Sequence, residues 1–169
     1  VRGRDPLPFD LLYWNSDSTR MSAANHSFYL RNCYLDNTLS AGKMEIAGKR
    51  LSLNDVKVPI YNLASREDHI APARSAFLGC HFFGGDVEFV MAGSGHIAGV
   101  VNPPASGKYQ YWTGGKPQGE FERWMAEATQ TPGSWWPHWQ AWIERQDAER
   151  VPARMPGGGK LQPLADAPG

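Results

Sequence analysis

Two short runs of apolar and β-branched residues mark the middle of the chain. They cover residues 58–64 and 87–92, and turn-forming residues bound each of them. Runs of this length and composition are typical of buried strands. Between them, Pro72 is placed to open a helix, because proline suits the first helical turn, where its missing N–H leaves no hydrogen bond unmade. The pattern predicts a strand, an acidic loop, a helix, a second strand and a loop that contains a histidine.

The segments before these runs predict a helix and a hairpin. Over residues 25–39 the apolar positions recur at steps of three to five, which favours a helix with one buried face. Residues 43–53 alternate between apolar and polar around Gly48 and Lys49, which favours a hairpin or edge strand with its turn at that pair. Residues 1–17 predict a charged connecting segment and then an aromatic cluster that ends in a turn or helix cap.

The segments after the second run predict two further helices. Apolar residues at helical spacing between positions 121 and 128 predict one helix, which the turn-forming residues 131–133 should end. Trp135, Trp139 and Trp142 are spaced by four and three, which places three indoles on one helical face, as packing against a sheet requires. The composition of the tail predicts an extended or disordered segment rich in proline, glycine and alanine.

Charge and composition exclude several classes of partner. The chain has 17 basic and 17 acidic residues, and the basic ones are scattered, so a nucleic-acid partner is not indicated. No apolar run approaches the ~20 residues that cross a bilayer, and the sequence does not begin with a secretory signal pattern. Cys33 and Cys80 fit neither a metal-ligand spacing nor a disulfide framework, which favours reduced thiols. These features predict a soluble cytosolic protein.

Two residues with catalytic chemistry follow the two predicted strands. Asp68 comes after the first strand and His96 after the second, within the glycine-rich segment 93–99. In α/β-hydrolase folds an acid and then a histidine follow the nucleophile in the chain, and the site lies beyond the carboxyl ends of the strands. The order predicts the last two members of a catalytic triad, with His96 as general base and Asp68 as the carboxylate that orients it. Simpler interpretations are a structural histidine and a helix-capping aspartate near Pro72.

Four blocks of the sequence resemble one enzyme family. Residues 65–70 (SREDHI) and 93–104 (GSGHIAGVVNPP) resemble the poly(3-hydroxyalkanoate) synthases, in particular the single-subunit class I enzymes. Residues 9–17 (FDLLYWNSD) and 133–142 (GSWWPHWQAW) agree with the same family. Together the blocks cover nearly the whole chain in the right order, which identifies it as the C-terminal part of such a synthase.

This resemblance implies a fold, an activity and a place in the cell. The fold is the C-terminal part of an α/β-hydrolase fold, in which residues 1–57 end a cap subdomain, residues 58–152 belong to the catalytic core and residues 153–169 form the tail. The implied activity is acyl transfer, in which (R)-3-hydroxyacyl coenzyme A, of short chain, is polymerised to a polyester with release of coenzyme A. The family implies a cytoplasmic homodimer at the surface of storage granules. No cofactor or metal is implied, because the coenzyme A thioester is the substrate.

The nucleophile for this chemistry is absent from the sequence. Enzymes of this family resemble lipases whose elbow serine is replaced by cysteine, and neither Gly-x-Cys-x-Gly nor Gly-x-Ser-x-Gly occurs here. Cys80 falls at the end of a predicted helix, so we expect it to be a packing residue. Since the chain begins with Val1, we expect a longer parent protein whose upstream part supplies the cysteine. The isolated fragment is predicted to be inactive and, with unpaired strands, poorly soluble.

Other interpretations stay open at the level of sequence. A related α/β-hydrolase with an upstream serine would hydrolyse esters, as an esterase or polyester depolymerase. A non-catalytic granule-binding protein would have to function with this chain alone. Asp68 could orient His96 or help to activate the 3-hydroxyl group of the substrate. The indoles between positions 135 and 142 could pack in the core or line a path for the acyl group or the polymer.

Overall fold

The computed structural model describes residues 14, 16–155, 157–161 and 163–165. The predicted segments at positions 1–13, and parts of the predicted tail, lie outside the described residues. The chain divides into two compact units, the first made of residues 1–58 and 82–86 and the second of residues 59–81 and 87–169. The division into residues 1–57 of a cap, residues 58–152 of a catalytic core and a tail stays a prediction.

The first unit contains a helix that changes its hydrogen-bonding pattern. Helix α2 covers Ala23–Tyr29 and continues as a π-helical segment over Leu30–Leu35. The Ser22 side chain caps it by accepting a hydrogen bond from the backbone N–H of Asn25 at 3.3 Å. The sequence predicted this helix. It also predicted a buried face on it, and that was wrong, because neither segment holds a buried residue and Tyr34 is 72% exposed. The other elements described in this unit are a short hairpin and one 3₁₀ turn.

The predicted hairpin is present in the first unit. Strands β1 (Met44–Ile46) and β2 (Lys49–Leu51) pair antiparallel. The turn residues are Ala47 and Gly48, with φ of 51° and 73°. Positive φ at both central residues gives the turn the twist that a two-residue hairpin requires. The turn therefore lies one residue earlier than the sequence pattern indicated.

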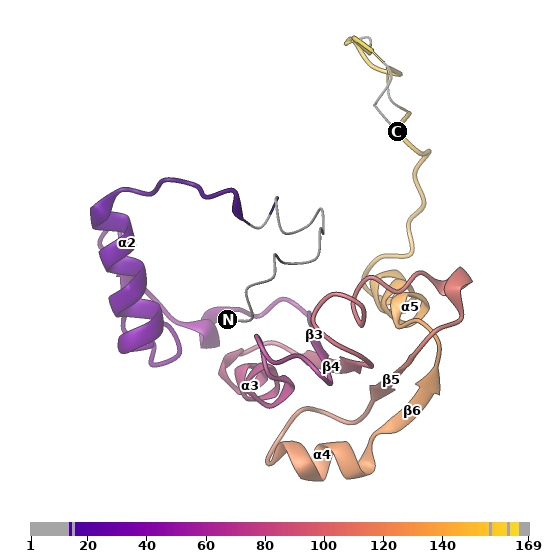
Figure 1. The fold of residues 1–169 in the computed structure, drawn as a ribbon, viewed down its shortest axis with the longest axis horizontal. Coiled ribbons are helices and arrows are strands. Elements are labelled where there is room, and N and C mark those ends of the chain that lie inside the picture. Colours follow the sequence, from indigo (N-terminus) through magenta and orange to yellow (C-terminus); the bar gives the residue numbers. More distant parts are fainter. Residues whose placement is uncertain (1–13, 15, 156, 162, 166–169) are drawn as a thin grey trace, which may run out of the picture. The chain divides into compact units, whose positions relative to one another are not determined.

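A four-stranded mixed sheet forms the centre of the second unit. Its strands are β3 (Ile60–Ser65), β4 (Val87–Ala92), β5 (Gln110–Thr113) and β6 (Thr129–Pro132), in the spatial order β3-β4-β5-β6 (Figure 1). Strands β3 and β4 are parallel, and the other two pairs are antiparallel. The sequence predicted β3 and β4 but neither of the other two. Residues 131–133, which were expected to end the helix predicted between positions 121 and 128, belong to β6 and the turn after it.

Three helices cover the sheet. Helix α3 (Ala73–Gly79) begins after Pro72, as predicted, and α4 (Phe121–Glu127) and α5 (Trp136–Gln146) are the two predicted C-terminal helices. Side chains of α3 and α4 form the buried core with one face of the sheet. In that core the Phe89 ring lies edge-on to Phe77 and Trp124, with centroids 5.2 and 4.8 Å apart. Since adjacent strand residues point to opposite faces, Asn62 and Ala64 face α3 while Tyr61 faces α5. The second unit therefore has three layers, helix, sheet and helix.

Candidate active site

Asp68 and His96 lie beyond the carboxyl ends of the two parallel strands. Backbone hydrogen bonds join the two loops, from Arg66 N–H to the Ala92 carbonyl at 2.9 Å and from Glu67 N–H to the Ser94 carbonyl at 3.0 Å. These bonds continue the pairing of β3 with β4 past the ends of the strands. The loop carrying Asp68 is therefore held beside the loop carrying His96.

The Asp68 carboxylate contacts both its own loop and the histidine. Its Oδ1 accepts hydrogen bonds from the backbone N–H groups of Ile70 and Ala71, at 2.8 and 3.0 Å. Its Oδ2 lies 2.7 Å from Nδ1 of His96. The Asp68 side chain is only 7% exposed, whereas the His96 side chain is 48% exposed. The carboxylate is thus covered and fully engaged, while the imidazole remains accessible.

The contacts of Asp68 keep it ionised. The backbone hydrogen bond from Ala71, followed by the bond to His96, lowers the pKa of the carboxyl from its ordinary 3.8 to about 2, although desolvation acts in the opposite direction. A charged carboxylate can only accept hydrogen bonds, so Nδ1 of His96 must carry its proton in the neutral ring. The basic nitrogen is then Nε2, which makes no hydrogen bond within the described part of the chain. This arrangement leaves one imidazole nitrogen available to take a proton from a substrate or nucleophile.

Glycines shape the loop around His96. Gly93 N–H donates to the Gln110 carbonyl at 2.7 Å, and Gly99 N–H donates to the Gly95 carbonyl at 3.1 Å. A Cβ atom on Gly99 would lie 2.2 Å from the Gly93 carbonyl oxygen, so only glycine fits where the loop folds back on itself. The loop also places Ser94 in the left-handed region, with φ of 70°. A tight backbone turn, and not an extended connection, therefore carries His96.

Cys80 does not join this pair. Cys33 is exposed in the first unit, and Cys80 is buried in the core of the second. The Cys80 sulfur accepts a hydrogen bond from the Asn62 side chain at 3.0 Å, and burial raises the pKa of its thiol. A nucleophilic cysteine needs the opposite shift, because the thiolate is the reactive form. Cys80 therefore has the packing role that the sequence predicted.

Four other residues lie close to Asp68 or His96 in the sequence. The neighbours Glu67 and His69 are exposed. Asn102 is buried and closes the turn after the histidine loop, where its Nδ2 donates to the Lys108 carbonyl at 2.8 Å and its Oδ1 accepts from the Ser106 hydroxyl at 2.8 Å. Ser65 is also buried, and its Oγ has no hydrogen-bond partner among the residues that the structure describes.

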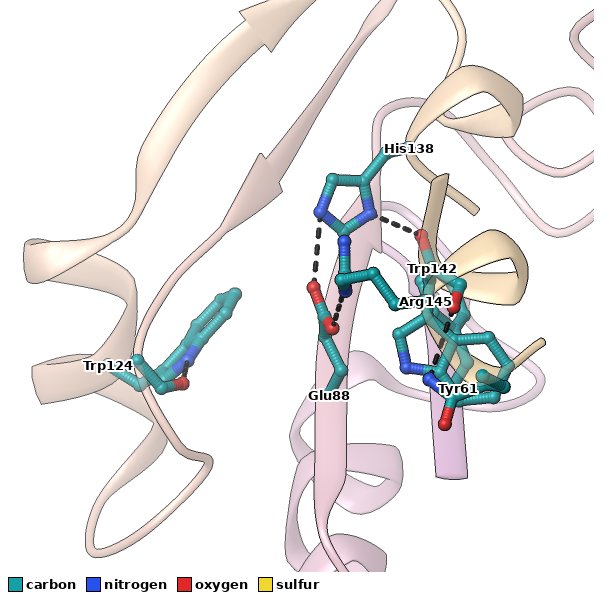
Figure 2. A network of polar contacts seen from close by, with 8 residues as sticks. Tyr61, Glu88, Trp124, His138, Trp142 and Arg145 are labelled. Carbon is teal, nitrogen blue, oxygen red and sulfur yellow. Dashed lines mark hydrogen bonds and ion pairs between the residues drawn. The ribbon is translucent and has the colours of Figure 1, made fainter. Parts of the chain in front are cut away.

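A second polar network, which the sequence analysis missed, lies between the sheet and α5. His138 on α5 places Nδ1 3.0 Å from the Tyr61 hydroxyl and Nε2 3.1 Å from the Glu88 carboxylate (Figure 2). Arg145 donates to the other oxygen of Glu88 at 2.8 Å. Burial raises the pKa of Tyr61 well above its ordinary value, so its hydroxyl stays protonated. The members lie far apart in the sequence, so no short motif could have indicated the network.

The described residues show neither a metal-binding cluster nor a membrane-spanning helix. Within the described ranges, no three or more His, Cys, Asp or Glu side chains are grouped so that they could hold a metal ion. Among the same residues, no helix has the length and apolar character to cross a membrane.

Known proteins match the chain over its full length. No protein-family model matches it. It is 70% identical over 169 residues to the poly(3-hydroxyalkanoate) polymerase subunit PhaC of Rhizobium meliloti, and 68% identical over 169 residues to that of Rhizobium etli. The corresponding subunit of Cupriavidus necator is 39% identical over 171 aligned positions. The chain spans only 28%, 27% and 29% of the lengths of these three relatives. By sequence, the chain is similar along its whole length to one part of poly(3-hydroxyalkanoate) polymerases.

Proposed function

We propose that the chain supplies the acid–base pair of a class I poly(3-hydroxyalkanoate) polymerase. Such an enzyme transfers the acyl group of a (R)-3-hydroxyacyl coenzyme A, of short chain, to a growing polyester and releases coenzyme A. The observation that carries the proposal is the 2.7 Å contact between His96 Nδ1 and Asp68 Oδ2 beyond the carboxyl ends of β3 and β4. The identity of 70% to a named polymerase supports this reaction for the proposed pair.

In the proposed mechanism, Nε2 of His96 moves protons between sulfur and oxygen atoms. A cysteine thiol outside this chain gives its proton to Nε2 as its sulfur attacks the thioester carbonyl. The new carbon–sulfur bond forms, the bond to coenzyme A breaks, and the departing thiolate takes the proton from the imidazolium. In the next step Nε2 accepts the proton of a 3-hydroxyl group, whose oxygen attacks the enzyme-bound acyl group. The cysteine sulfur leaves and regains the proton, so each cycle restores the starting state.

Asp68 fits the orienting role better than direct activation of the substrate hydroxyl. Its Oδ1 is occupied by two backbone N–H groups and its Oδ2 by the imidazole. The side chain is 7% exposed, which leaves little room for a substrate oxygen. An ionised carboxylate in this position fixes the Nδ1–H tautomer and stabilises the imidazolium that forms during proton transfer.

The wider features of the proposal follow from the family relationship. They are an α/β-hydrolase fold with residues 1–57 in a cap and residues 58–152 in the core, a homodimeric state, and a cytoplasmic location at granule surfaces. The mixed sheet with helices on both faces is compatible with that fold. The proposed reaction uses no metal and no cofactor, since the coenzyme A thioester is its substrate.

The test is a chimeric polymerase, in which this chain replaces the 169 matching residues of the Rhizobium meliloti subunit. Release of coenzyme A from (R)-3-hydroxybutyryl coenzyme A is measured with a thiol reagent. We expect the chimera to be active and the His96→Ala variant to lose roughly a thousandfold or more in rate, as removal of a catalytic base does. His69→Ala, in an exposed neighbour, is the matched control and should retain the rate.

Two results would count against this function. Coenzyme A release that survives the His96→Ala change would remove His96 from the mechanism. Free hydroxy acid as the only product, with no polymer, would instead favour the alternative of an ester hydrolase.

A further inference from the structure

Two adjacent tryptophans bind one backbone carbonyl at the end of the histidine turn. The indole N–H groups of Trp135 and Trp136 donate to the carbonyl oxygen of Val100, at 3.1 and 3.0 Å. Val100 lies four residues after His96 in the sequence. The backbone N–H of Asn102 also donates to this oxygen, at 3.1 Å, so the carbonyl accepts from three donors, two of which are the indoles.

The turn that contains His96 is connected to this carbonyl by its own hydrogen bonds. Val100 N–H and Val101 N–H both donate to the Ile97 carbonyl, at 3.0 and 2.8 Å, and Gly99 N–H donates to the Gly95 carbonyl at 3.1 Å. Residues 95–101 therefore form one compact, hydrogen-bonded turn. A displacement of the Val100 carbonyl would be transmitted through this turn to His96.

The two tryptophans are attached to a rigid support. Trp135 precedes α5, and its ring lies 6.1 Å from Tyr61 and 6.0 Å from Trp139, measured between centroids. Helix α5 is in turn fixed to the sheet, because His138 and Arg145 both bind Glu88 of β4 (Figure 2). The indoles thus connect a helix packed on the sheet to a glycine-rich loop that has few side chains of its own to hold it.

We propose that Trp135 and Trp136 are positioning residues that hold the His96 turn in register with Asp68. The proposal rests on the proposed function, because it assigns these residues to the same proton transfer. The His96 ring is 48% exposed and is restrained by one hydrogen bond to Asp68, so its position depends on where the backbone turn is held. Proton transfer is sensitive to such placement, and a shift of about 1 Å in a catalytic group can cost on the order of a hundredfold in rate.

The main experiment removes both indole donors from the chimeric polymerase. In the double variant Trp135→Phe/Trp136→Phe we expect kcat for coenzyme A release to fall about tenfold or more, with KM changed less than about twofold. Trp139→Phe is the matched control, since Trp139 is on α5, its ring lies tilted against that of Trp135, and its indole makes no hydrogen bond in the described part of the chain. That variant should keep both kinetic constants.

A second substitution separates the lost hydrogen bonds from lost packing. Replacing both residues with 3-benzothienylalanine keeps the bicyclic ring and removes only the N–H donor. We expect this variant to melt like the parent chimera and to show the same selective fall in kcat. A normal kcat with intact folding would overturn the proposal, and so would an equal loss in the Trp139→Phe control.

A double-mutant cycle tests whether the tryptophans act through His96. In a His96→Ala background, removing the two donors should not lower the residual rate further, because the group they position is already gone. A further fall would show that they act by another route and would overturn the proposal.

Hydrogen exchange separates this proposal from the proposed function. Whatever the activity of the chimera, loss of the two donors should increase amide exchange in residues 95–101 and leave β3 and β4 protected. Unchanged exchange in that turn would refute the positioning role. An inactive parent chimera, or one that tolerates His96→Ala, would instead refute the proposed function.

Discussion

At the scale of single residues, the Asp68 carboxylate divides its two oxygens between two tasks. Oδ1 is bound by the backbone N–H groups of Ile70 and Ala71, so the conformation of the loop fixes the side chain. Oδ2 is thereby held 2.7 Å from the His96 ring. Because these contacts lower the pKa of Asp68 to about 2, the carboxylate stays charged throughout the pH range in which an imidazole titrates.

Asp68→Asn is therefore expected to separate the charge of this residue from its shape. The asparagine oxygen can still accept the two backbone hydrogen bonds, so the loop should keep its conformation. The imidazolium loses its counter-charge, and the Nδ1–H tautomer is no longer enforced. We expect coenzyme A release by the chimeric polymerase to fall by about a hundredfold or more, with little change in thermal stability.

The neighbouring carboxylate provides the control for this exchange. Glu67→Gln removes one negative charge from an exposed position in the same loop, and it should leave the rate within about twofold. Equal losses in the two variants would mean that general loop charge matters, and they would contradict the specific role of Asp68.

At the scale of elements, α5 is held to the sheet by groups that respond to pH. His138 contacts the Tyr61 hydroxyl and the Glu88 carboxylate, Arg145 binds the same carboxylate, and the Tyr111 ring lies 5.8 Å from the imidazole. Burial lowers the pKa of His138 below its ordinary 6.5, an effect that Glu88 opposes and Arg145 reinforces. The docked helix thus favours the neutral imidazole.

Acidification is expected to loosen α5. Because the folded pKa of His138 lies below 6.5, the undocked state binds the proton more readily, so the stabilisation is complete above pH 6.5 and is lost as pH falls through the folded pKa. Hydrogen exchange of residues 136–146, corrected for the intrinsic rate, should show protection falling between about pH 7 and pH 5.

Replacing the titrating group should remove this dependence. In His138→Gln the amide can still contact Tyr61 and Glu88 but does not titrate, so α5 should be equally protected at both ends of that pH range. The exposed His69→Gln change should leave the pH dependence as it is. Persistence of the dependence in His138→Gln would assign it to another group.

The elements also show which parts of the fold a single sequence can predict. Strands β3 and β4 were predicted because each has six residues rich in apolar side chains. Strand β6 was not, since Thr129–Pro132 contains no large apolar residue and is a strand only through its pairing with β5. In the site, Asp68 and His96 could be located because each follows a recognisable strand. His138 contacts Tyr61 and Glu88, and the two tryptophans contact Val100. Both sets of contacts depend on tertiary packing, which no local spacing indicates.

At the scale of the whole molecule, the two edges of the sheet differ in character. One edge is β6, which has four polar or proline residues and ends at Pro132. The other is β3, which has six residues and pairs with no strand except β4 within the described residues. A parallel pair at an open edge is unusual, because parallel strands are ordinarily covered on both faces and flanked by further strands. The unpaired backbone groups of β3 therefore offer a template for association with another chain.

The isolated 169-residue chain is expected to self-associate through β3. Static light scattering should show a mass that grows with concentration, because exposed strand edges pair with one another. Hydrogen exchange then identifies the edge responsible: amides of β3 should become more protected as concentration rises, while those of β6 serve as an internal control and should not change. A monodisperse preparation that melts cooperatively would contradict the prediction. Protection that increased in β6 instead would show that proline and polar side chains do not protect that edge, and would place the contact on the opposite side of the sheet.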